Sequence, residues 1–207
     1  MNPPEPLDPG TRALVGLAAA IATGRDLLVR ERVGRVLAAR VPALWADELL
    51  LQSVLMVGYP RALAAALVWR ELSGGGVESI EDGGDFAQFP TWRARGEANC
   101  RVIYGEHYDQ LRANVERLHP ALDAWMVVEG YGRTLGRPGL DLKRRELCVI
   151  AQVAVLGAER QLHSHLKGAL HAGASRGEIG AAIAIAESDC PAPQAARARM
   201  LWTRVAG

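Results

Sequence analysis

The C-terminal half of the sequence carries two side chains of the types that proton transfer needs. Glu146 opens the apolar run Leu-Cys-Val-Ile-Ala-Gln-Val-Ala-Val-Leu, so its neighbours on a helix face are apolar. Apolar surroundings make a carboxyl group a better proton carrier near neutral pH. His165 follows nineteen residues later beside another apolar stripe, and histidine can act as an acid or a base near neutral pH. We therefore expect Glu146 and His165 to be catalytic residues.

Each of these residues also has a purely structural interpretation. Glu146 would favour the positive N-terminus of a helix and pair with an arginine, and His165 would be a hydrogen-bonded core histidine. His163 lies roughly 200° around the helix from His165, so the two histidines do not face one metal ion. Glu159, four residues before His163, would give that histidine a surface ion pair. We expect no metal site.

Arg137 is the candidate for holding an anionic group of a substrate. It precedes Pro-Gly in a turn that leads towards Glu146, and arginine is the usual fork for a carboxylate. A solvated arginine in a loop is the alternative. The sequence has no Gly-rich phosphate loop, no HExxH and no GxSxG motif, and we expect no cofactor.

Helical periodicity dominates the elements that must position these residues, and no convincing strand appears. A segment rich in glycine and acidic residues, 73–90, is expected to be a mobile linker between two halves. Gly58-Tyr59-Pro60 is expected to separate two helices. The expected helices cover 9–21, 26–40, 46–57, 61–72, 91–104, 106–118, 120–134, 146–156, 158–171, a helix after the capping box at 175–178, and a last helix to 203.

The two halves form an internal repeat, which survives in scaffold residues and fails at residues that could do chemistry. A shift of 133 positions places Ala13 opposite Glu146, Arg32 opposite His165 and Arg30 opposite His163. The scaffold identities include Asp8 with Asp141, Arg12 with Arg145, Leu14 with Leu147 and Gly24 with Gly157, and a slip of a few residues adds Glu48 with Glu178. We expect the site to lie in the second copy.

Two stretches of the second half resemble the carboxymuconolactone decarboxylase family. They are 130–147 (GYGRTLGRPGLDLKRREL) and 161–179, which contains Gln-Leu-His-Ser-His-Leu-Lys-Gly-Ala-Leu and then Gly-Ala-Ser-Arg-Gly-Glu-Ile. In the first half, 47–62 is similar to another segment of the same family. The resemblance implies an all-α fold, the alkylhydroperoxidase D-like helical bundle, in two tandem repeats. Residues 1–72 would form a first repeat with a degenerate site, and 91–207 a second repeat with the candidate active site.

The resemblance also separates two chemistries on this fold. The peroxidase branch carries Cys-x-x-Cys-x-x-x-His, and those cysteine positions hold Ala158 and Gln161 here, so dithiol chemistry is not expected. The decarboxylase branch keeps the histidine without the cysteines, although its tryptophans before Arg-Pro-Gly are replaced by Tyr131 and Leu135.

We expect a cofactor-free lyase or isomerase that acts on a small carboxylated lactone or a related acid, with His165 as general acid. The expected substrate-binding residues are Arg137, Gln161, Tyr131 and His163. The alternatives are a redox protein in which Cys148 acts alone, and a non-catalytic helical protein that keeps the fold for assembly.

Composition sets limits on partners and location. The 207 residues carry a formal net charge of +1, so there is no large basic field for nucleic acid. Three scattered cysteines, without a CxxC, fit a reducing compartment. The apolar run at 13–22 is shorter than the roughly 20 residues that span a bilayer. We expect a cytoplasmic protein with no membrane partner. Small residues at Gly168, Ala169 and Ala172 favour a homo-oligomer, for which a trimer of tandem chains is one expected order.

Overall fold

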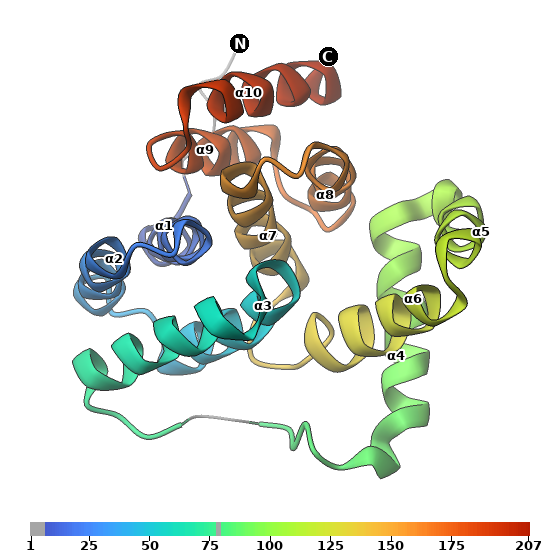
Figure 1. Cartoon of the computed structure of the whole chain (residues 1–207), viewed down its shortest axis with the longest axis horizontal. Helices are drawn as coiled ribbons and strands as arrows, with labels where there is room; N and C mark the ends of the chain where they lie inside the picture. The colour runs from blue at the N-terminus through green and yellow to red at the C-terminus, as the bar shows by residue number, and fades with distance from the viewer. Residues whose placement is uncertain (1–6, 78–79) are drawn as a thin grey trace.

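The computed structural model describes residues 7–77 and 80–207, and this part of the chain is all-α, with no strand (Figure 1). The expected all-helical class is therefore confirmed. The helices are α1 (Pro9–Thr23), α2 (Asp26–Ala38), α3 (Ala43–Ser73), η1 (Phe86–Gln88), α4 (Phe89–Tyr104), η2 (Gly105–His107), α5 (Tyr108–Leu118), α6 (Pro120–Trp125), η3 (Met126–Thr134), α7 (Leu142–Leu156), α8 (Glu159–His171), α9 (Arg176–Glu187) and α10 (Ala192–Ala206).

Residues that are visible in the sequence set the ends of the central helices. Asp8 before α1 and Asp141 before α7 each accept a hydrogen bond of 2.9 Å from the backbone N–H three residues later. Each helix ends at a glycine in the left-handed region, Gly24 after α1 and Gly157 after α7. Ser175 begins α9 with the expected capping box. The repeat therefore reproduces the same helix with the same two boundaries.

The break predicted at 58–60 is present inside α3. Gly58 has φ 72° and ψ 169°, which is not helical and which an L side chain rarely adopts, and Pro60 cannot donate a backbone hydrogen bond. The range Ala43–Ser73 therefore consists of two helical segments that meet at a kink, as the sequence predicted.

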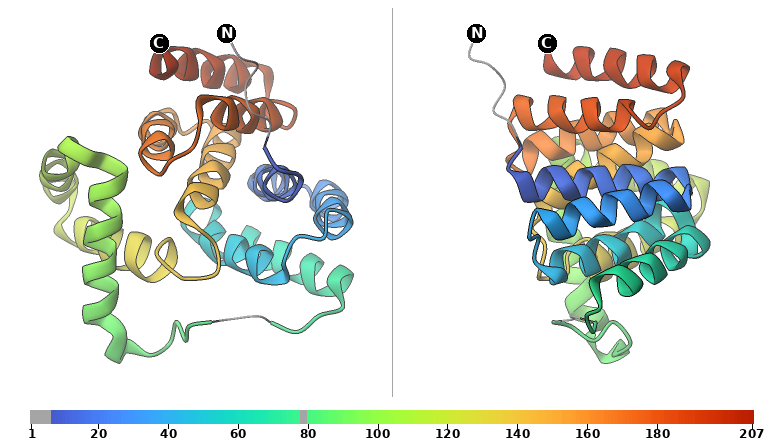
Figure 2. Two further views of the ribbon diagram at one scale, coloured as in Figure 1. Left: turned by 180° about the vertical axis from the view of Figure 1, so that it is seen from behind. Right: turned by 90° about the vertical axis from the view of Figure 1, so that its left-hand side faces the viewer.

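The two repeats pack around α1 and α7, which lie next to each other at the centre (Figure 1). Near their starts, Arg144 Nε donates to Thr11 Oγ1 at 2.8 Å, and these two positions are equivalent in the repeat. Helix α9 of the second repeat packs on α1, just as α3 of the first repeat packs on α7. The right-hand view in Figure 2 shows that the axes of α9, α1, α2 and α3 are roughly parallel, whichever way the chain runs along each. This exchange of helices makes one continuous core from the two copies.

Helices α4 to η3 form an addition that covers α8 (Figure 1). The helix expected at 120–134 becomes a short α6 followed by a π-helix, η3. Helix η3 lies directly against α4, because a Cβ atom at Gly132 would be 2.0 Å from the carbonyl oxygen of Trp92. π-Helical turns occur often at functional sites, and this one carries Tyr131.

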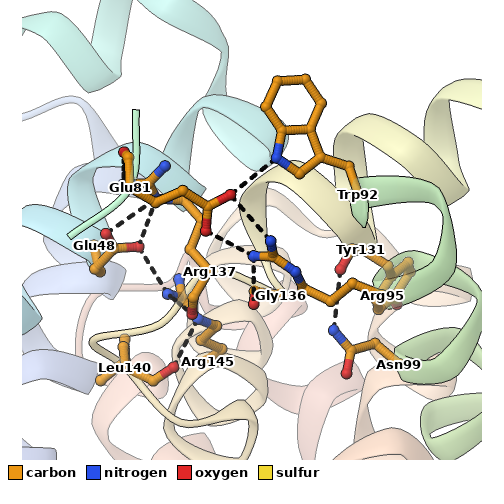
Figure 3. A network of polar contacts seen from close by, with 10 residues as sticks. All are labelled: Glu48, Glu81, Trp92, Arg95, Asn99, Tyr131, Gly136, Arg137, Leu140 and Arg145. Carbon is orange, nitrogen blue, oxygen red and sulfur yellow. Dashed lines mark hydrogen bonds and ion pairs between the residues drawn. The ribbon is translucent and has the colours of Figure 1, made fainter. Parts of the chain in front are cut away.

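The segment expected to be a mobile linker is held in place where the structure describes it near Glu81. That carboxylate accepts hydrogen bonds from Arg95 at 2.9 and 3.0 Å and from Trp92 Nε1 at 2.9 Å (Figure 3). The expected mobility does not hold at Glu81, because a composition rich in glycine does not reveal an ion pair made with α4. Residues 78–79 lie outside the described residues.

Helix α3 is also the one helix within 7–77 and 80–207 that is long and apolar enough to cross a membrane. Length and composition alone are weak evidence for a span, because α3 buries Asp47, Glu48 and Gln52 in the protein core. Its other face carries exposed apolar residues at four-residue spacing, which we call the α3 stripe. They are Leu51, Leu55, Tyr59, Leu63 and Leu67.

The small residues of α8 that suggested an assembly surface are covered within the chain. Gly168 and Ala169 are buried, and Ile103 of α4 lies directly over Gly168. That basis for an oligomer is therefore wrong, since sequence alone did not show that α4 returns to cover α8.

Candidate active site

Glu146 and His165 lie together where α7 and α8 cross. His165 Nδ1 is 2.8 Å from Glu146 Oε2, and the residues are 6% and 0% exposed. Glu146 lies in the first turn of a helix that is buried from Arg145 to Val155, so the apolar run seen in the sequence encloses it. The expected contact between these two side chains is present in the structure.

One atom on each side chain remains available. Glu146 Oε1 is buried and makes no hydrogen bond to any described residue. His165 Nε2 makes no hydrogen bond to a described residue, and the His165 side chain is 8% exposed. A neutral imidazole that donates Nδ1–H to the carboxylate presents Nε2 as a base, and the protonated ring presents Nε2–H as an acid. The pair therefore has the geometry of a positioned proton carrier.

Helix α4 and the π-helix supply the wall beside this pair. Tyr131 and Tyr104 share a hydrogen bond of 2.9 Å between their hydroxyl groups. Burial raises the pKa of Tyr131 well above its usual value, and the neighbouring Tyr104 and Glu146 add to the increase. Burial raises the pKa of Tyr104 in the same way. Both phenols therefore stay protonated at neutral pH and can act only as neutral hydrogen-bonding groups.

The absence of a side chain at Gly168 allows α4 and the Glu146 carboxylate to approach α8 closely. A Cβ atom at Gly168 would lie 2.6 Å from Ile103 Cγ2 and 3.0 Å from Glu146 Oε2. Distances below 3.0 Å require atoms to shift, so a side chain at this position would push α4 away from the carboxylate.

The structure does not place Arg137 beside the pair. Its Nε donates to both oxygens of Glu48 at 3.0 and 3.1 Å, and its Nη2 donates to the Glu81 carbonyl at 2.9 Å (Figure 3). The side chain is 6% exposed. The expectation that Arg137 binds a substrate carboxylate is corrected, because an internal carboxylate from the first repeat already occupies its guanidinium.

Arg145 completes this network from the first turn of α7. It is fully buried and donates to Glu48 Oε2 at 2.8 Å and to the Leu140 carbonyl at 3.0 Å (Figure 3). It also donates to Gln52 Oε1 at 3.2 Å. Burial lowers the pKa of Arg145, which the hydrogen bond to Glu48 partly offsets. One carboxylate from α3 thus joins two arginines of the second repeat.

The two other expected substrate-binding residues on α8 point elsewhere. Gln161 is exposed one turn before His165. His163 lines a separate cavity of about 280 Å³, together with Tyr104, Lys167 and other residues of α5 and α8. Burial and the charge of Lys167 lower the pKa of His163. The alternative ion pair with Glu159 is not formed either, because that carboxylate binds a residue of α10 at 2.8 Å.

The cysteines have the environment of inert thiols. Burial raises the pKa of Cys100 and of Cys148 to about 12, and that of Cys190 to about 11. Thiolate is the reactive form, so little of it exists at neutral pH. No group of three or more His, Cys, Asp or Glu side chains in the described ranges could hold a metal ion.

Sequence reasoning missed Tyr104, Ile103 and Glu48. The first two come from α4, which has no motif, and Glu48 lies 89 positions from Arg137. The signal available for Glu48 was its place in the repeat opposite Glu178, which marked it as scaffold without naming its partner.

Comparison with known proteins agrees with this architecture. The model of the carboxymuconolactone decarboxylase family matches residues 1–71 and 120–204, which correspond to the two repeats and leave out the linker and α4–α5. The chain is 42% identical over 80 residues to an uncharacterized 15.0 kDa protein from the nqo9-nqo10 intergenic region of Paracoccus denitrificans. That match covers 38% of this chain and 58% of the relative. The chain belongs to the carboxymuconolactone decarboxylase family.

Proposed function

We propose that this protein is a cofactor-free lyase or isomerase that moves a proton on a small carboxylated lactone or a related acid. The observation that carries the proposal is Glu146 Oε1, a buried carboxylate oxygen without a described partner, next to a histidine anchored by the other oxygen. Leaving a buried acceptor unpaired costs about 1–3 kcal/mol, so such an atom calls for an explanation. The proposal depends on this arrangement, in which one oxygen of a buried carboxylate anchors the histidine and the other has no described partner.

The chemistry follows from the atoms of the pair. In a decarboxylation, the bond from carbon to the leaving carboxylate breaks, and its electron pair moves into the conjugated lactone carbonyl. Carbon dioxide leaves, and the dienolate carbon takes the proton from His165 Nε2–H. The imidazole then recovers a proton from water. Glu146 accepts Nδ1–H throughout, so it fixes the ring orientation and stabilises the imidazolium form.

The burial of Glu146 and His165 supports proton transfer in weakly hydrated surroundings. Tyr104 and Tyr131 contribute neutral hydroxyl groups beside Glu146, with the pKa of each raised by burial. A low-dielectric site strengthens each hydrogen bond to developing charge. The redox alternative is disfavoured, because the pKa of Cys148 is about 12 and no second thiol is near it in the sequence.

The test is turnover of a carboxylated muconolactone, measured as carbon dioxide release and as uptake of one solvent deuterium by the product in D₂O. Glu146→Gln removes a buried charged hydrogen bond worth about 1.5–3 kcal/mol, so kcat should fall about 10- to 100-fold. His163→Ala is the matched control, because that histidine lies on the same helix, whereas the hydrogen bond to Glu146 is made by His165. Equal activity of Glu146→Gln and the wild type would contradict the proposal.

A further inference from the structure

The first repeat has a cavity at the position where the second repeat has the Glu–His pair. Ala13 and Arg32, which the repeat places opposite Glu146 and His165, both line this cavity of about 450 Å³. Its lining residues come from α1, α2 and the end of α9, where Ile185 lies. Figure 1 shows the arrangement of these three helices. The first repeat therefore has no Glu–His pair, as expected, yet it retains a hollow at the corresponding place.

The charged side chains that line this cavity are all arginines, and one of them, Arg32, stands opposite His165 in the repeat. Its lining contains Arg12 from α1 together with Arg32 and Arg35 from α2, and it contains no acidic side chain. The remaining lining residues are small, apolar or neutral: Pro9, Ala13, Gly16, Ala39, Ala184, Ile185 and Ser188. Guanidinium groups among small, uncharged lining residues favour a negatively charged ligand.

Acidic groups outside the lining compensate only part of this charge. Arg32 Nη2 lies 3.3 Å from both oxygens of Asp189, which Arg25 also approaches at 3.7 Å. Arg35 pairs with Glu31 one turn away on the same helix. Arg12 makes no ion pair with any residue in the described ranges 7–77 and 80–207, and it is exposed.

The broken symmetry of the repeat explains why Arg12 has no acidic partner among the described residues 7–77 and 80–207. Its counterpart Arg145 is buried and binds Glu48 at 2.8 Å. The counterpart of Glu48 is Glu178, which instead accepts from the Ser175 backbone N–H at 2.7 Å and pairs with a lysine of α7. Because this carboxylate is already engaged, the guanidinium of Arg12 is available to a ligand.

A second polar atom in the cavity also lacks an acceptor. Arg32 Nε is buried and makes no hydrogen bond to a described residue, although the side chain packs over Gly16. A buried N–H without an acceptor is costly, and Arg32 Nε would gain one if the side chain turned towards a bound oxyanion. The volume of about 450 Å³ is in the range of cavities that hold small molecules.

We propose that the first repeat binds a small organic anion in this cavity, through carboxylate or phosphate oxygens that contact Arg12, Arg32 and Arg35. The second repeat would supply proton transfer and the first repeat would supply anion recognition, each at the same place in its own copy. This inference does not depend on the proposed lyase activity, because it concerns different residues on different helices.

The test is isothermal titration calorimetry of the full chain at low ionic strength, with succinate in one arm and inorganic phosphate in the other. We expect saturable binding of one anion per chain in at least one arm, and that arm identifies the ligand class. Arg12→Gln combined with Arg35→Gln should weaken binding at least about tenfold, because two charge-assisted contacts are lost. Both side chains are exposed, and a thermal melt checks that the fold is retained.

Two controls make the result specific. Arg93→Gln removes an exposed arginine of α4 that pairs with Glu97, and it should leave anion binding unchanged. His165→Ala should also leave it unchanged, which separates this site from the proposed catalytic pair. Absence of saturable binding in both arms, unchanged binding in the double variant, or an equal loss in Arg93→Gln would overturn the proposal.

Discussion

Replacing Glu48 with glutamine tests whether Arg137 and Arg145 form a structural network. In the folded protein the Glu48 carboxylate is 0% exposed and accepts from Arg137 at 3.0 and 3.1 Å and from Arg145 at 2.8 Å. A neutral amide would leave two buried guanidinium groups without a countercharge. Breaking a buried ion pair in this way costs about 3–5 kcal/mol. For a chain of this length, that loss lowers Tm by roughly 10 °C.

The free energy of unfolding is measured by urea denaturation, with Glu97→Gln as the matched control. Glu97 makes an exposed pair with Arg93 on one helix, which is worth less than about 0.5 kcal/mol. If Glu48→Gln loses no more stability than Glu97→Gln, then the network is not structural. In that case the earlier interpretation of Arg137 as a residue that binds substrate would be restored.

Three further outcomes are expected. The hydrogen bond from Arg95 holds the pKa of Glu81 below the ordinary 4.5, so the unfolded chain binds a proton first as pH falls. The stability that this pair contributes should therefore be complete above pH 4.5 and be lost as pH falls below it. Glu81→Gln should remove that part of the pH dependence of the free energy of unfolding. With a pKa of about 12, Cys148 should react with a thiol reagent only after unfolding, and rapid reaction of the folded protein would revive the redox alternative. We also expect a homo-oligomer whose subunits meet through the α3 stripe. The double variant Leu63→Glu, Leu67→Glu should have a lower mass by light scattering than the wild type. A wild-type protein that is monomeric at micromolar concentration would refute this assembly.

The sequence predicted those parts of the fold that depend on local signals. Asp141 and Gly157 mark the ends of α7 because capping is a property of a few adjacent residues. The contact between Glu146 and His165 was predictable because the repeat and the family resemblance both single out these positions. The break at Gly58 was predictable for the same reason, because Gly-Tyr-Pro is a local signal, and the structure has non-helical backbone at that position.

The parts that could not be predicted depend on contacts between distant segments. Arg137 looked like a free anion-binding group because its partner Glu48 lies in the other repeat. The tyrosine pair needs α4 and the π-helix to approach through Gly132, and no local pattern encodes that approach. The arginine-lined cavity of the first repeat was likewise invisible, because a lost Glu–His pair does not reveal what space remains.

The most direct test of the catalytic pair compares His165→Gln with His163→Gln on the same carboxylated lactone. The two histidines lie on one helix, but only His165 contacts Glu146, at 2.8 Å. General acid catalysis contributes about 10²–10⁴-fold, so His165→Gln should lose that much kcat while the protein stays folded. His163→Gln should stay close to the wild type. Equal turnover of the two variants would contradict the assignment of proton transfer to Glu146 and His165.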